Sequence, residues 1–192
     1  MYEEKCLMES FVPKVDFDFF SSLPFQPSDL ERSVPFLKGG VVMQSSANTL
    51  TKEIPRAGGS VKLSFFGGLD MRRARDPDKA GDNGIYVASL LDLAATKLKT
   101  LWDRASFKDY FDLDVLLQNG VILSEALGAA KAIYGASFNP LISLKALQYF
   151  EDGDVGRLST EARSRLVAAV KRVDPGVLPS VQSRHGLSPE GR

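Results

Sequence analysis

Two aspartates near the start of the sequence have the residue type and spacing for metal chemistry. Asp16 and Asp18 alternate with apolar residues in Val15–Phe20, the period-two pattern of a half-buried strand. Alternation places both carboxylates on one face, about 6–7 Å apart. They repel each other unless a cation lies between them, and Mg²⁺ prefers such oxygen ligands. The pattern predicts a Mg²⁺ site, and the alternative is an edge strand with one solvated polar face.

Charged residues later in the sequence allow a structural and a functional interpretation. The segment from Asp70 to Asp82 is interpreted as a solvated loop, with a local phosphate-binding patch as the alternative. Its basic residues are Arg72, Arg73, Arg75 and Lys79. Asp109 and Asp112 lie three residues apart on one face of an expected helix, opposite its buried face. Pairing of these two carboxylates with Lys108 or Arg104 is the structural alternative.

Composition limits the class of protein. The 192 residues are 44% hydrophobic, which suffices for one well-cored domain, or for one domain with a small appendage. Lys and Arg together number 24, as do Asp and Glu, so global charge gives no argument for nucleic-acid binding. The single cysteine and single histidine exclude a disulfide framework and a Cys/His zinc site. Without a secretory signal or an apolar run of ~18–20 residues, we expect a cytoplasmic protein with no membrane partner.

The first half of the sequence predicts mainly strands. Short apolar runs separated by Gly- and Ser-containing turns are typical of an antiparallel meander. We expect strands at 15–20, 41–44, 49–54, 61–66 and 85–88, and a helix beginning at Pro27. In the fourth of these strands one face carries Val61, Leu63 and Phe65, and the other carries Lys62, Ser64 and Phe66.

The second half predicts helices. Ser89 is a candidate N-cap with Asp92 in the capping-box position, and an apolar stripe at helical spacing follows, with Lys97 off that stripe. Further helices are expected at about 107–118, 123–134, 140–149 and 159–173. The predicted fold class is α+β, with a β-rich core over 1–88, a helical region packed on it over 89–174 and a disordered tail over 175–192.

Four segments in a fixed order carry a resemblance to a known family. They are residues 15–22, residues 61–66, residues 88–97, and Arg104 together with residues 108–113. The set resembles the AbiEii/AbiGii-type nucleotidyltransferases of the DNA polymerase β-like superfamily, whose members include toxins of bacterial toxin–antitoxin and phage-defence systems. The resemblance implies a small mixed sheet with a flanking helix, followed by a helical bundle. It also implies Mg²⁺-dependent transfer of a nucleotide from an NTP to an RNA (a tRNA end, for example) or protein acceptor, and a cognate antitoxin as partner.

The same resemblance implies roles for individual residues. Asp16 and Asp18 match the pair that holds Mg²⁺ at the nucleotide phosphates. Lys97 matches a lysine that contacts these phosphates. Asp109 and Asp112 match the last motif, where an aspartate acts as a base or a structural acid, and Asp112 is favoured because it lies deeper in the helix.

The sequence departs from the family pattern in two places. Residues 1–14 contain no glycine, although family members carry a Gly-Gly or Gly-Ser phosphate cradle before the paired aspartates. Ser64 stands where the superfamily often has a third carboxylate, and Lys62 on the same face is a weaker phosphate candidate. The first departure suggests an upstream start or a truncated gene. The alternatives to an active enzyme are an inactive member that binds a partner such as an antitoxin, and a plain α+β interaction domain.

Overall fold

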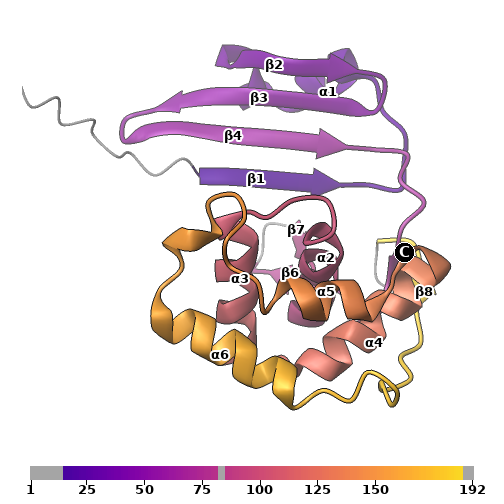
Figure 1. Ribbon diagram of the computed structural model, residues 1–192. Helices are drawn as coiled ribbons and strands as arrows, with labels where there is room; N and C mark the ends of the chain where they lie inside the picture. Colours follow the sequence, from indigo (N-terminus) through magenta and orange to yellow (C-terminus); the bar gives the residue numbers. More distant parts are fainter. Residues whose placement is uncertain (1–14, 82–84, 188–192) are drawn as a thin grey trace, which may run out of the picture. The chain divides into compact units, whose positions relative to one another are not determined.

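The chain divides into two compact units between Asp70 and Met71. The computed structural model describes residues 15–81 and 85–187, so the glycine-free segment 1–14 lies outside the described residues. The sequence placed the boundary near residue 88 instead. Three short strands therefore belong with the helices: β5 (Arg72–Arg73), β6 (Asp78–Ala80) and β7 (Ile85–Val87) (Figure 1).

The first unit is built on a four-stranded mixed sheet, as the sequence predicted. The strand order is β1 (Val15–Phe20), β4 (Gly59–Phe66), β3 (Thr49–Arg56), β2 (Val41–Ser46) (Figure 1). Strands β2, β3 and β4 form the expected antiparallel meander, and β1 adds to β4 in parallel. Within this sheet β1 and β2 are the two edge strands.

One face of the sheet is apolar and is covered by the segment between β1 and β2. Helix α1 (Pro27–Ser33) begins with a proline that suits the first helical turn, and the 3-10 helix η1 (Pro35–Gly39) follows it. Leu30 of α1 and Leu37 of η1 pack with Leu63 and its neighbours in the smaller hydrophobic core. The predicted separation of Leu63 from Lys62 and Ser64 is confirmed by this packing.

A buried lysine interrupts the apolar face. Lys52 of β3 is only 3% exposed, and its ammonium pairs with the Glu31 carboxylate from α1. A buried charge requires such a partner, because an unpaired one would cost several kcal/mol. This ion pair ties α1 to the sheet, and strand alternation alone gave no sign of it.

The second unit is a helical assembly around a larger hydrophobic core (Figure 1). Its helices are α2 (Leu90–Thr100), α3 (Phe107–Gln118), α4 (Leu123–Tyr134), α5 (Pro140–Ala146) and α6 (Thr160–Lys171), with 3-10 turns η2 (Gly135–Ser137) and η3 (Val155–Arg157). The predicted N-cap is confirmed, since the Ser89 hydroxyl accepts a hydrogen bond from the Asp92 backbone N–H. Leu90 from the predicted apolar stripe is exposed, whereas Leu91 and Leu98 are buried.

The expected disorder of residues 175–192 is wrong for residues 175–187. Strand β8 (Arg184–His185) pairs with β5, and Leu178 and Val181 pack against the helical core. The Pro179 carbonyl lies so close to Gly128 of α4 that a Cβ there would collide with it. Two apolar side chains and a close backbone approach therefore order a segment whose composition suggested disorder.

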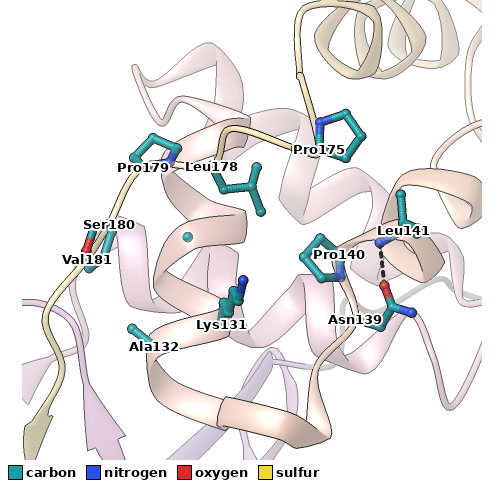
Figure 2. A pocket seen from close by; sticks show the side chains of 12 residues that line it. Lys131, Ala132, Asn139, Pro140, Leu141, Pro175, Leu178, Pro179, Ser180 and Val181 are labelled. Carbon is teal, nitrogen blue, oxygen red and sulfur yellow. Dashed lines mark hydrogen bonds between the residues drawn. The ribbon is translucent and has the colours of Figure 1, made fainter.

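The docked segment also borders a cavity of about 700 Å³. Lys131 from α4, Pro140 at the start of α5 and Pro175 line it, and the Asn139 side chain beside it accepts a hydrogen bond from the Leu141 backbone N–H (Figure 2).

Among the described residues, no single helix is long and apolar enough to cross a bilayer. The helical segments 107–118 and 123–137 reach the length and apolar composition of a membrane span only when they are taken together, and a bend of 119° separates them.

We expect Gly128→Ala to release the docked segment. The new Cβ must displace the Pro179 carbonyl, while alanine itself favours the helix. Limited proteolysis should then cut residues 175–187 faster, with the helical circular dichroism retained. Gly156→Ala is the matched control because a Cβ at Gly156 meets nothing closer than 4.0 Å. Equal cleavage rates in both variants would contradict this packing.

Candidate functional site

The two aspartates predicted to hold a metal lie on the exposed edge strand β1 of the first unit. The register with β4 pairs Asp16 with Lys62 and Asp18 with Ser64, so all four side chains share one face of the sheet. Both aspartates are exposed, and that face lies opposite the one covered by α1. The two aspartates therefore share one face of β1, as predicted, although Phe17 on the opposite face is 51% exposed and not buried.

The neighbours of the two carboxylates differ. Lys62 lies in register between Asp16 on β1 and Glu53 on β3, so a cation stands between two carboxylate positions. Asp18 instead has Ser64 beside it, which is 2% exposed and can contribute no charge. Of the two aspartates, Asp16 has a basic residue beside it in register, whereas Asp18 has a hydroxyl.

This pair of carboxylates fits Mg²⁺ as part of a site completed by a ligand. Within residues 15–81 and 85–187, no three His, Cys, Asp or Glu side chains gather closely enough to form a protein-only metal site. Mg²⁺ keeps several waters and is commonly bound through one or two carboxylates together with substrate phosphates. Two exposed carboxylates on one face of a strand meet that requirement.

The second unit brings together three other predicted residues. Lys97 of α2 places its ammonium 2.9 Å from a carboxylate oxygen of Asp109 and 2.5 Å from one of Asp112, both on α3. The Arg104 guanidinium, from the connection between these helices, donates to Asp109 at 2.9 Å. Lys97 is therefore a paired, partly buried lysine and not an isolated surface one.

Asp109 is the most deeply buried residue of this cluster. Its side chain is only 1% exposed, whereas that of Asp112 is about half exposed. The sequence placed both on the helix face opposite the buried one, which is wrong for Asp109. The reason is that Lys97 and Arg104 neutralise its carboxylate and so permit its burial. Arg104, an alternative partner considered from the sequence, does bind Asp109.

Hydrogen bonds within the cluster stabilise the charged forms of Asp109 and Lys97. Burial alone favours a neutral Asp109, but hydrogen bonds from Arg104 and Lys97 outweigh it and hold the pKa of Asp109 below its ordinary value. Burial likewise opposes the charged form of Lys97, yet hydrogen bonds to Asp112 and Asp109 raise the pKa of Lys97 above its ordinary value. At neutral pH the site therefore presents a protonated lysine fixed by an ionised carboxylate.

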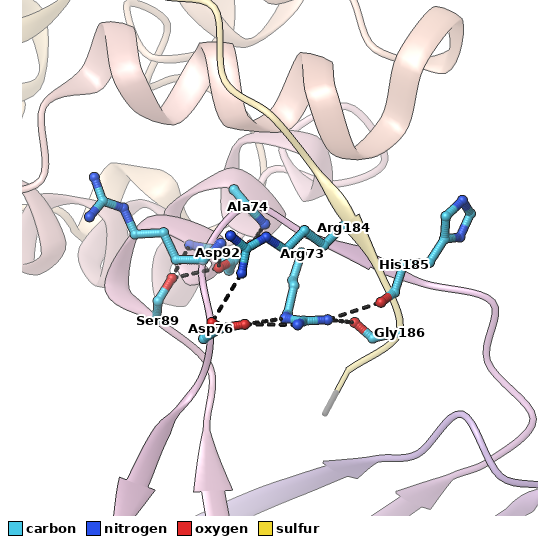
Figure 3. A network of polar contacts seen from close by, with 9 residues as sticks. Arg73, Ala74, Asp76, Ser89, Asp92, Arg184, His185 and Gly186 are labelled. Atoms are coloured by element: carbon cyan, nitrogen blue, oxygen red, sulfur yellow. Dashed lines mark hydrogen bonds and ion pairs between the residues drawn. The ribbon is translucent and has the colours of Figure 1, made fainter. Parts of the chain in front are cut away.

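A second polar network was not predicted. Arg73 of the charged segment is 5% exposed; its guanidinium donates to the Asp76 carboxylate and to the backbone carbonyls of His185 and Gly186 (Figure 3). The interpretation of this segment as a solvated loop is wrong at Arg73. The basic side chain serves to hold strand β8 against β5.

The same segment is anchored on helix α2. The Asp92 carboxylate accepts hydrogen bonds from the backbone N–H groups of Ala74 and Arg75, at 2.6 and 3.0 Å, and from the Ser89 hydroxyl (Figure 3). The capping-box position of Asp92 was the available signal for this role.

A third buried carboxylate belongs to Asp114 of α3. It accepts hydrogen bonds from Nε and Nη2 of the Arg165 guanidinium on α6, and sequence periodicity gave no sign of this pair.

The candidate residues thus form two separate groups. Asp16, Asp18 and Lys62 share a sheet face in the first unit, and Lys97, Asp109 and Asp112 form an ion-pair cluster in the second. Each group could contribute to phosphate chemistry, the first through carboxylates and the second through a fixed ammonium.

We expect Asp109→Asn to destabilise the protein by roughly 1–3 kcal/mol near neutral pH, because the buried acceptor of two charge-assisted hydrogen bonds is lost while Lys97 keeps Asp112 as a partner. The depressed pKa of Asp109 means that its stabilisation is present above the ordinary value of 3.8 and is lost as the pH falls through the lower folded-state value. Urea unfolding should therefore show the gap between wild type and variant narrowing below pH 3.8. The exposed Asp103→Asn is the control, and a gap that does not change with pH would contradict the assignment.

Comparisons with known proteins identify the family and a relative of this chain. An uncharacterized protein of Aquifex aeolicus (strain VF5), aq_aa25, is 31% identical over 140 residues, which cover 71% of this chain and 65% of that protein. The chain thus spans slightly less than two thirds of the relative's length. No solved structure matches. The model of the family described as "Nucleotidyl transferase AbiEii toxin, Type IV TA system" matches residues 15–183. The chain therefore belongs to the AbiEii family of nucleotidyl transferase toxins of type IV toxin–antitoxin systems.

Proposed function

We propose that the protein is a Mg²⁺-dependent nucleotidyltransferase that moves a nucleotide from an NTP to an RNA or protein acceptor and thereby acts as a toxin. The observation that carries the proposal is the exposed pair Asp16 and Asp18 on one face of β1, at the start of the segment that matches the family. A cognate antitoxin is the partner that family membership implies.

Asp16 and Asp18 are assigned to hold Mg²⁺ at the nucleotide phosphates. Bound there, the ion would neutralise charge on the phosphates and help to position them. Lys62, beside Asp16 in register, is a further phosphate contact. The buried Ser64 offers no third carboxylate, so phosphate oxygens and water are needed to complete the ion's shell.

Lys97 is assigned to contact the phosphates as a point charge. An ammonium has three donors, and Asp109 and Asp112 engage two of them. Asp109 is buried and bound by two cations, so it acts as a positioning residue that keeps Lys97 charged and aimed.

Asp112 is the candidate general base, because its carboxylate is half exposed and Asp109 is buried. In the proposed reaction an acceptor hydroxyl oxygen bonds to the α-phosphorus, and the bond from that phosphorus to the oxygen bridging it to the β-phosphate breaks. Pyrophosphate leaves with the electron pair of that bond, and the hydroxyl proton passes to the Asp112 carboxylate.

A non-catalytic role is the second candidate, and the edge strand β2 favours it. Val41, Val42 and Met43 of that strand are all more than half exposed, and the strand carries no charged residue that would discourage pairing with another chain. A family member without catalysis would act through binding a partner such as the antitoxin, and strand addition at β2 suits that role.

Label transfer by the full chain decides between these functions. Each of the four α-³²P-labelled NTPs is incubated with Mg²⁺, the protein and total RNA or total protein as acceptor. We expect transfer that Asp18→Asn reduces by about 100-fold or more, because a lost metal ligand removes transition-state stabilisation. Asp29→Asn is the control, an exposed aspartate on α1 at the opposite face of the sheet.

The outcomes separate the two candidates. Transfer that survives in Asp18→Asn would overturn the assigned metal site. Absence of transfer and of Mg²⁺-dependent NTP binding, in a wild-type protein that melts cooperatively, would favour the non-catalytic role.

A further inference from the structure

An aromatic pair lies on the same sheet face as the two aspartates and has no role in either hydrophobic core. Phe20, the last residue of β1, stacks on Phe66 of β4 with ring centroids 5.4 Å apart and planes inclined by 20°. The register places both rings on the face of Asp16 and Asp18. Phe20 is 53% exposed, so one aromatic surface remains open to solvent.

A neighbouring pair shows what a core aromatic in this sheet looks like. Phe19 stacks on Phe65 with centroids 4.9 Å apart, and both pack against the apolar cluster below α1. The Phe20–Phe66 pair repeats this stacking on the polar face, without apolar neighbours from that cluster. Burial therefore explains the first pair and leaves the second unexplained.

The spacing along β1 suits one extended ligand. Side chains two residues apart on a strand are separated by about 7 Å, so Asp18 lies about 7 Å and Asp16 about 13 Å from Phe20 along the strand. The face thus presents two carboxylates at one end and an open aromatic ring at the other. A nucleotide has the same order of chemistry, with phosphates that need cations at one end and a flat base at the other.

We propose that Phe20, supported by Phe66, is a stacking platform for the base of the nucleotide whose phosphates are held at Asp16 and Asp18. The platform rests on the proposed function, since it needs a nucleotide at these carboxylates. Every base has a π-face, so such a platform accepts all four. Purines offer the larger stacking area, and purine nucleoside triphosphates are therefore the preferred class.

Calorimetric titration with three probes tests the platform on the full chain. The probes, each with Mg²⁺, are ATP, CTP and inorganic tripolyphosphate, which carries phosphates but no base. Phe20→Ala should weaken ATP binding between about fivefold and a hundredfold, the range for one stacked base, and should leave tripolyphosphate binding unchanged. Phe20→Tyr should restore ATP binding, because tyrosine keeps the aromatic face.

Phe17→Ala is the matched control. Phe17 lies on the same strand with nearly the same exposure, 51%, but on the opposite face. It should leave the binding of all three probes unchanged. Upfield shifts of the ATP base protons on binding to wild type, absent with Phe20→Leu, give a second readout that does not depend on affinity.

The outcomes distinguish this inference from the function on which it rests. Unchanged ATP affinity in Phe20→Ala, with binding still lost in Asp18→Asn, would overturn the platform and leave the phosphate site standing. Equal weakening of ATP and tripolyphosphate would also overturn it, since it would mean that Phe20 only supports the strand. If neither ATP nor tripolyphosphate bound to wild type, both the platform and the proposed function would fail.

Discussion

The register of β1 on β4 is the constraint on which the candidate chemistry of the first unit depends. A strand that slipped by one residue would turn Asp16 and Asp18 toward the apolar face and turn Phe19 away from it. Phe19 stacks on Phe65 and packs into the cluster around Leu63. A slipped strand would place a carboxylate among these apolar side chains, which is unfavourable. The position of the aspartates is thus set by packing on the other side of the sheet.

In the second unit, three buried carboxylates fix the positions of the groups that they bind. Asp92 is satisfied by backbone N–H groups and the Ser89 hydroxyl, Asp114 by Arg165, and Asp109 by Lys97 and Arg104. The first two serve architecture, since one anchors a loop on α2 and the other joins α3 to α6. Asp109 differs because one of its partners is a partly exposed lysine, and fixing that lysine also fixes a positive charge at the surface.

Local patterns predicted the elements well, and long-range contacts explain what they missed. The alternation in β1, the capping box at Ser89 and the bounds of α3 could be predicted because neighbouring residues determine them. The burial of Lys52 and Arg73 could not, because Glu31 for the first and the carbonyls of His185 and Gly186 for the second lie far away in the sequence. The same holds for residues 175–187, which pack against the helical core and approach α4 closely at Gly128. In the candidate site, the shared face of Asp16 and Asp18 could be predicted, but the burial of Asp109 could not, because it depends on both Lys97 and Arg104.

The distribution of charge on the aspartate face bears on how a metal would bind there. Lys62 lies beside Asp16, so the repulsion between the two aspartates is already reduced without any ion. Under the proposed function the two carboxylates alone would form a weak Mg²⁺ site, because no metal-binding group of three or more His, Cys, Asp or Glu residues includes them among the described residues. A triphosphate would add the negative oxygens that such a site lacks. We therefore infer that metal and nucleotide bind together, with Asp18, which has no basic residue beside it in register, as the main protein ligand.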